Sequence, residues 1–186
     1  PGLSKLWVMS HHGEVKEILA ELQPNMETTL SPQLNVVEMD DTGETSLLQA
    51  SLLPWPQAVA PGTGGDFLFE PTPGLIKSEL LQRNPPHGWF SGNARGTLWF
   101  APAIDRSYPG RWTEVALLLE NLSMGKSAAA LKAAGISAAS VKSREVPIRS
   151  EEVRKKLQLD EGDHSRVYLS QAGNKRWLVA GKALRD

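Results

Sequence analysis

The pattern of apolar and polar residues in the first third of the chain predicts β structure with one ambiguous stretch. Residues 6–10 form an apolar run, and after a His-Gly turn the apolar positions resume at 15, 18, 19 and 22. That spacing fits one face of a helix, but a hairpin that pairs residues 6–10 with residues 15–22 fits almost as well. Residues 35–44, NVVEMDDTGE, predict a strand that ends in an Asp-Thr-Gly turn.

Proline and glycine interrupt the chain near residue 60. The segment 52–65, LLPWPQAVAPGTGG, holds three prolines and three glycines, so it predicts a connection rather than a helix or a central strand. We therefore expect a boundary there, between a β-rich segment over residues 1–60 and an α+β region over residues 61–186.

A helix is predicted just after this boundary. Thr72 can cap it with Pro73 at its first position, and residues 84–86, Asn-Pro-Pro, end it. Its expected buried stripe is Leu75, Ile76, Leu80 and Leu81. Residues 97–101 and 113–119 then predict apolar strands.

The last third has the clearest pattern. An Ala-rich helix over residues 123–134 ends at Gly135, a strand is predicted over 139–148, and Ser150 can cap a helix over 151–159. Residues 166–170 and 176–181 flank a Gly-Asn turn and predict a hairpin. The predicted fold class is therefore α+β, with mixed or antiparallel sheets, few helices and a helix-strand-helix-hairpin unit over about residues 112–186.

Composition limits the chemistry and reveals a charge asymmetry. The absence of cysteine excludes disulfides and thiolate sites and favours a reducing compartment, with the cytoplasm as the default. Residues 1–123 carry 7 Lys and Arg against 14 Asp and Glu, a net charge of −7, whereas residues 124–186 carry 13 against 7, a net charge of +6. A basic segment of this kind suits either a polyanionic partner or a solvated surface.

Two motifs resemble parts of an amino-methyltransferase. Residues 84–87, Asn-Pro-Pro-His, resemble the loop that holds a target nitrogen, and residues 62–66, GTGGD, resemble a cofactor loop. However, the Asn-Pro-Pro stretch follows a predicted helix instead of a parallel strand, and the glycines follow a proline-rich connection. The alternative interpretation, a helix terminator and an ordinary turn, is favoured for both.

Other catalytic patterns are incomplete. Gly125-Lys126-Ser127 precedes a helix as in a phosphate-binding loop, but Glu120 stands where the opening glycine belongs. His11 and His12 are adjacent and point apart on helix and strand alike, which argues against a metal site. No complete catalytic apparatus is visible, so we expect neither catalytic nor metal-binding residues in this chain.

Three stretches together resemble a known family. Residues 67–81, FLFEPTPGLIKSELL, resemble the Tyr-Leu-Tyr-Glu-Pro-Asp segment of a family of S-adenosylmethionine-dependent methyltransferases that end in a THUMP-like domain. Residues 138–184 resemble that family's ending: a basic strand, an acidic then basic helix, Leu-x-Leu, Gly-Asp and an apolar hairpin. Residues 13–22, GEVKEILAEL, are similar to the stretch that closes its methyltransferase domain. Ser143 and Glu145 depart from the pattern by replacing a Lys and a Gly.

The resemblance implies a role for the whole chain. Residues 1–22 would be the last antiparallel hairpin of a methyltransferase sheet, with the cofactor loop before Pro1, so this chain would bind no S-adenosylmethionine although its parent would. The THUMP-like end would recruit RNA, either tRNA or rRNA, and would contact the N-terminal methyltransferase domain of the same protein. The expected phosphate contacts are Lys142, Arg144, Arg149, Arg154 and Lys155, with Lys156 and Lys132 as additions.

Two further hypotheses remain open at this point. The chain could be a self-contained small amino-methyltransferase that uses GTGGD and NPPH, or an intramolecular or protein-interaction domain whose basic face docks on the acidic half of the chain. The aromatic residues Trp89, Phe90, Trp99 and Phe100 could stack on bases, but we expect at least half of them in the core.

Overall fold

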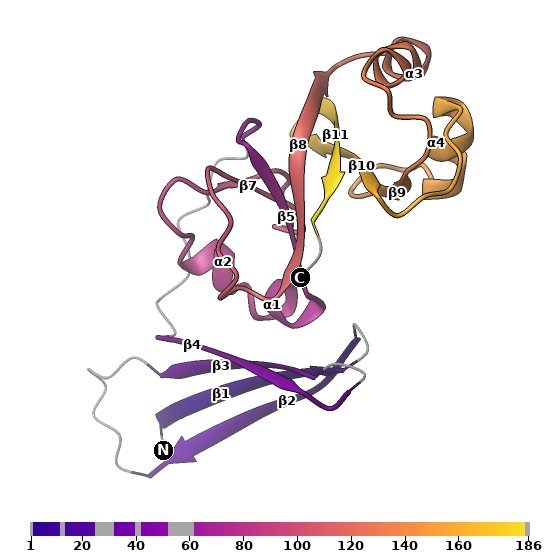
Figure 1. Cartoon of the computed structure of the whole chain (residues 1–186). Helices are drawn as coiled ribbons and strands as arrows, with labels where there is room; N and C mark the ends of the chain where they lie inside the picture. Colours follow the sequence, from indigo (N-terminus) through magenta and orange to yellow (C-terminus); the bar gives the residue numbers. More distant parts are fainter. Residues whose placement is uncertain (1, 12–13, 25–31, 40–41, 52–61, 185–186) are drawn as a thin grey trace. The chain divides into compact units, whose positions relative to one another are not determined.

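The computed structural model describes residues 2–11, 14–24, 32–39, 42–51 and 62–184 (Figure 1). Within it the chain divides into two compact units. The first unit comprises residues 1–59, 71–87 and 105–110, and the second comprises residues 60–70, 88–104 and 111–186. Each unit is built on its own sheet, so the two are described in turn.

A four-stranded sheet with the order β2-β1-β3-β4 forms the first unit (Figure 1). Its strands are β1 (Gly2–His11), β2 (Glu14–Gln23), β3 (Gln33–Met39) and β4 (Thr45–Ser51). β1 pairs with β2 in an antiparallel hairpin and with β3 in parallel. The hairpin interpretation of the first residues is therefore confirmed, and the helical one is wrong. β4 was not predicted, because four of its seven residues are polar and no strict alternation marks it.

The helix expected after residue 72 is present as two short helices. α1 (Pro73–Ser78) and α2 (Leu80–Arg83) are separated by Glu79, whose φ of 55° is left-handed. α1 packs on β1 and β3, which accounts for the burial of Leu75. Thr72 precedes α1 as expected, but its hydroxyl donates to the Glu38 carboxylate and caps no backbone N–H. Asn84 ends α2, as predicted.

The second unit is a seven-stranded sheet with the order β6-β7-β5-β8-β11-β10-β9. The first four strands along the chain are β5 (Phe67–Pro71), β6 (Phe90–Ser91), β7 (Trp99–Ala101) and β8 (Gly110–Glu120). The remaining strands are β9 (Ser140–Ser143), β10 (Ser165–Ala172) and β11 (Lys175–Ala183). β10 pairs antiparallel with β11 as the predicted hairpin, and parallel with β9.

Two helices follow β8 and β9, and they complete the second unit. α3 (Met124–Ala133) begins at Ser123, whose hydroxyl accepts from the Lys126 N–H, as the sequence predicts. α4 (Ser150–Leu157) lies between β9 and β10 in the chain. The element order and the two mixed sheets confirm the α+β class.

Alternation along β10 and β11 divides the core of the second unit between the two faces of the sheet. Val167 and Leu169 belong to one cluster, which also contains Leu131 of α3 and Leu157 of α4. Tyr168, between them, belongs to the other cluster, together with residues of β5 and β7. Neighbouring residues of a strand point to opposite faces, so α3 and α4 cover one face only.

The strand predicted over residues 139–148 is shorter than expected. β9 ends at Ser143, and Glu145 has a left-handed φ of 57° that turns the chain out of the ladder. Arg149, not Ser150, occupies the cap position of α4. The Ser150 hydroxyl instead accepts from the Ser143 N–H at 3.0 Å and so ties the start of α4 to the end of β9.

Gly181 lies at an irregularity in the pairing of β11 with β8. The register shifts between Ala180 and Gly181, and here the strands approach closely. A Cβ atom at Gly181 would overlap the carbonyl oxygen of Glu114 and lie 2.8 Å from its carbonyl carbon. The absence of a side chain therefore allows the two central strands to meet.

Candidate nucleic-acid interface

α4 carries most of the basic residues expected to contact phosphate, and their surroundings differ. Val153 and Leu157 face the core, whereas Arg149 and Lys155 are exposed. Lys156 donates to Glu152 one turn earlier at 2.7 Å, as the i,i+4 spacing predicts. α4 therefore presents two exposed cations for which no described residue provides an ion-pair partner, Arg149 and Lys155.

Lys142 and Arg144, at the end of β9, are engaged inside the second unit. Lys142 Nζ and Arg144 Nη2 each lie 2.6 Å from a carboxylate oxygen of Glu70 on β5. The Tyr168 hydroxyl donates to the same carboxylate at 3.3 Å. Glu70 is only 6% exposed, so this cluster links β5, β9 and β10 through one buried anion.

The carboxylate of Glu70 stays ionised in spite of its burial. Burial alone would raise its pKa, but the charges and hydrogen bonds of Lys142 and Arg144 outweigh that effect and hold the pKa below its ordinary value. Conversely, burial and the nearby Glu70 carboxylate raise the pKa of Tyr168, so its hydroxyl remains a donor. One feature of the sequence marks this cluster: a lone acidic residue, Glu70, inside the apolar strand FLFEP.

The lowered pKa of Glu70 predicts a specific loss of stability in acid. Its contribution is complete above the unfolded carboxyl pKa of about 4.3, and it is lost as the pH falls through the lower folded pKa, because the unfolded chain binds the proton more readily. We expect urea unfolding, followed by tryptophan fluorescence, to show this decline between pH ~5 and pH ~3. The variant Glu70→Gln should lack this part of the decline, and identical pH profiles for the two proteins would contradict the assignment.

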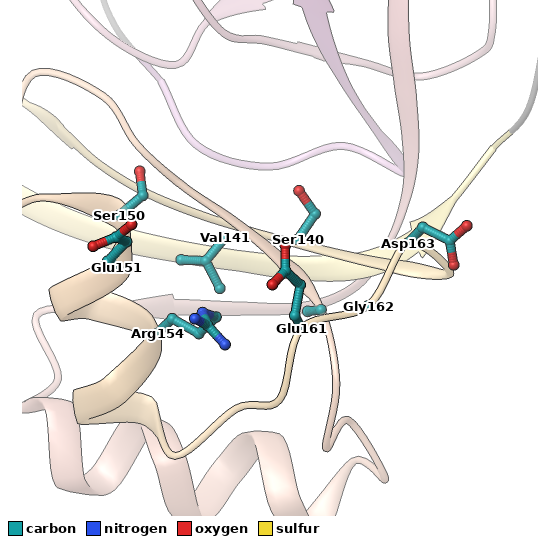
Figure 2. A pocket seen from close by; sticks show the side chains of 9 residues that line it. Ser140, Val141, Ser150, Glu151, Arg154, Glu161, Gly162 and Asp163 are labelled. Carbon is teal, nitrogen blue, oxygen red and sulfur yellow. The ribbon is translucent and has the colours of Figure 1, made fainter.

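Arg154 lies in a hollow that also contains acidic side chains. The hollow, of about 560 Å³, is formed by β9, the first turns of α4 and the loop before β10 (Figure 2). Arg154 extends from α4 toward the loop residues Glu161 and Gly162, and Glu151 lies at the start of the helix (Figure 2). Arg154 is therefore in a different environment from Arg149 and Lys155. No pattern in the sequence indicates that Glu161 shares its site.

Three of the four aromatic residues proposed for base stacking are in the core. Trp89, Trp99 and Phe100 are at most 7% exposed, which confirms that at least half of the set is structural. Trp89 packs edge-on against Phe69 and Trp112, with ring centroids 5.3 and 5.4 Å apart. Phe90 is 46% exposed.

The two methyltransferase-like motifs lie in different units of the structure. Asn84 and His87 belong to the first unit and follow α2, a helix, while residues 62–66 belong to the second unit and lead into β5. Gly62 N–H donates to the Ser91 carbonyl at 2.9 Å, and the Thr63 hydroxyl donates to the Glu120 carboxylate. The glycine segment therefore leads into a strand and does not open a helix as a nucleotide loop does.

Within the described parts of the chain, no three His, Cys, Asp or Glu side chains are grouped so that they could hold a metal ion. None of the helices in those parts has the length and apolar character needed to cross a membrane.

Comparison with known proteins supports the resemblance seen in the sequence. The model of the THUMP domain-like family matches residues 121–183, which contain α3, β9, α4 and the β10–β11 hairpin. No curated protein matches the chain. The match confirms the THUMP-like character of this segment.

A solved structure shares the fold of almost the whole chain. It is a crystal structure of a "putative methyltransferase" from Porphyromonas gingivalis W83, with 18% sequence identity and a TM-score of 0.72. The match covers 98% of this chain and 46% of that one, so this chain spans about half the length of the structure that it resembles. At this identity the likeness concerns the fold.

Proposed function

We propose that this chain is the non-catalytic, RNA-recruiting part of an S-adenosylmethionine-dependent methyltransferase. The observation that carries the proposal is the THUMP domain-like match to residues 121–183, which lie almost entirely within the segment of +6 net charge. Folded RNA is recognised mostly through its shape and phosphates, and exposed Lys and Arg on a helix suit that mode.

Arg149 and Lys155 are the residues that we assign to phosphate contact. Both are exposed, Lys155 on α4 and Arg149 at its N-cap, and neither is held in an ion pair by a described residue. Lys142 and Arg144 were predicted for the same role, but their terminal nitrogens already bind Glu70. Replacing them would disturb the fold as well as the charge, so they are poor probes of RNA binding.

Salt-dependent binding of tRNA tests this assignment. The double variant Arg149→Ala/Lys155→Ala should bind tRNA more weakly, and the slope of log K against log salt should flatten by roughly 1 to 2 between ~50 and ~200 mM, because two counterion-releasing contacts are lost. Fluorescence anisotropy with labelled tRNA measures both quantities.

The matched control removes the same charge elsewhere in the second unit. Lys175 and Arg176 are exposed at the start of β11, so Lys175→Ala/Arg176→Ala has the same net charge as the test variant. We expect it to retain most of the wild-type affinity. Equal losses in the two double variants would refute the assignment to α4, and the absence of any salt-sensitive tRNA binding by the wild-type chain would refute the recruiting function.

S-adenosylmethionine would bind outside the residues of this chain. The candidate loop, residues 62–66, does not fit the cofactor, because Gly62 N–H is bonded to Ser91 and the segment enters a strand instead of a helix. Calorimetric titration of the chain with S-adenosylmethionine should therefore give no binding heat. Micromolar binding would instead favour the alternative of a self-contained small methyltransferase.

We propose that the sheet of the first unit contacts the methyltransferase domain of the same protein. Its strand β2 exposes Ile18, Leu19 and Leu22, each between 49% and 61%, and β4 exposes Leu47. Exposed apolar residues on an open strand edge are normally covered in a functional assembly. The structure that this chain resembles is more than twice as long, so it contains further chain that could supply such a cover.

A further inference from the structure

The hollow beside α4 contains opposite charges that do not neutralise one another. Arg154 and Glu161 both line it, as does Glu151, yet within the described residues none of these three side chains forms an ion pair or a hydrogen bond with another residue. Asp163, the fourth charged residue of the lining, points away and binds its neighbour His164 at 2.8 Å (Figure 2). An unpaired guanidinium that faces unpaired carboxylates across a hollow suits a ligand with both acceptors and donors.

The size and the remaining lining limit what this ligand can be. The volume of about 560 Å³ lies within the ~300 to 1,000 Å³ typical of small-ligand sites. The side chain of Val141 contributes an apolar surface, which suits a flat ring better than a phosphate. The two carboxylates of Glu151 and Glu161 beside one arginine would also repel a phosphate, so the hollow differs in kind from the exposed surface around Arg149 and Lys155.

Guanine matches this arrangement better than the other bases do. Its O6 and N7 are adjacent acceptors that an Arg side chain binds in a bidentate manner. Its N1–H and N2–H₂ groups are adjacent donors that one carboxylate can accept together. Adenine and uracil lack this donor pair, and cytosine offers a carboxylate only its N4–H₂ group.

We propose that the hollow lined by Arg154, Glu161 and Glu151 binds an unpaired guanine base of the recruited RNA. Arg154 donates to O6 and N7, and Glu161 or Glu151 accepts from N1–H and N2–H₂. This inference rests on the proposed RNA-recruiting function and adds base recognition to it, while Arg149 and Lys155 supply phosphate contacts that are independent of sequence.

The experiment uses four fluorescein-labelled pentaribonucleotides, UUGUU, UUAUU, UUCUU and UUUUU, with the full chain. We expect UUGUU to bind about tenfold more tightly than each of the others, since one good bidentate contact discriminates by about that factor. Replacing the central guanine by 7-deazaguanine removes N7, and replacing it by hypoxanthine removes the N2 amino group. Each replacement should weaken binding by about fivefold to tenfold.

Variants link each ligand atom to a side chain. Arg154→Ala should bind the 7-deazaguanine and guanine pentamers within about twofold of each other, because the partner of N7 is already gone. A Glu151→Gln/Glu161→Gln double variant should likewise lose the discrimination against hypoxanthine. Lys155→Ala, a change on the same helix outside the hollow, should weaken all pentamers alike and keep the preference for guanine.

The outcomes separate this inference from the function on which it rests. Equal affinity for all four pentamers, together with intact salt-dependent tRNA binding, overturns the guanine site and leaves RNA recruitment standing. A preference for another base, or guanine preference that survives both the Arg154 and the glutamate substitutions, also overturns it. If neither pentamers nor tRNA bind, the proposed function fails, and the guanine site fails with it.

Discussion

Glu70→Gln should lower the free energy of unfolding of the second unit by about 3 kcal/mol at neutral pH. The substitution keeps the size of the side chain but removes the charge that neutralises Lys142 and Arg144. Removing one partner of a buried ion pair typically costs about 3 to 5 kcal/mol, and the lower end applies because Arg144 is 40% exposed. The Tyr168 hydroxyl retains an amide oxygen as its acceptor, so the loss is mainly electrostatic.

Tryptophan fluorescence is suited to this measurement. Trp89, Trp99, Trp112 and Trp177 all lie in the second unit and are buried, so the urea unfolding curve reports mainly on that unit. Glu152→Gln provides the matched control: it removes the exposed partner of Lys156, which should cost no more than about 0.5 kcal/mol. Similar midpoints for the two variants would show that the Glu70 cluster contributes no more than a surface pair.

Gly181→Ala should destabilise the second unit by a comparable amount, about 3 kcal/mol. The new methyl group would overlap the backbone of Glu114, which belongs to β8, and neither strand can move freely within the sheet. The effect is steric, since the backbone of Gly181 is not in the left-handed region. Overpacking of a rigid site normally costs about 1 to 3 kcal/mol, and a clash with backbone belongs at the upper end.

Gly125→Ala is the control for this prediction. Gly125 lies in the first turn of α3, and an added Cβ there would meet no atom within 4 Å. Alanine favours the helix over glycine, so this variant should gain about 0.5 kcal/mol. Replacing glycine by alanine should therefore lower the free energy of unfolding at position 181 and raise it at position 125, as measured by urea unfolding. If Gly181→Ala left the free energy of unfolding unchanged, β8 and β11 would be able to move apart at this point without a loss of stability.

Local features of the fold were predictable, and long-range ones were not. The β10–β11 hairpin follows from alternation around a Gly-Asn turn, and α3 follows from its Ser123 cap and Ala-rich pattern. The division of the helix at Glu79 depends on α1 packing on a distant sheet. Likewise, the parallel pairings of β1 with β3 and of β9 with β10 depend on segments that no turn connects.

The candidate interface shows the same limit. The basic residues of α4 could be recognised from charge alone, because the exposed face of a helix follows from its local sequence and does not depend on contacts with distant segments. That Lys142 and Arg144 turn inward depends on Glu70, which is 72 and 74 residues away in the chain. The hollow combines residues of α4 with a loop before β10, and the Glu161 side chain becomes relevant only once the fold places it opposite Arg154.

The position of β8 in the seven-stranded sheet has a consequence for how the protein is made. β8 pairs with β11, so Glu120 meets Trp177 and Thr113 meets Ala183, across a sequence separation of about 60 to 70 residues. At a synthesis rate of roughly 5 to 20 residues per second, β8 leaves the ribosome about 3 to 14 s before its partner. During that interval β8 has only its earlier neighbour β5 to pair with, and Leu117, Leu118 and Leu119 lack their partners on β11. The exposed apolar edge makes the nascent chain a natural client for chaperones.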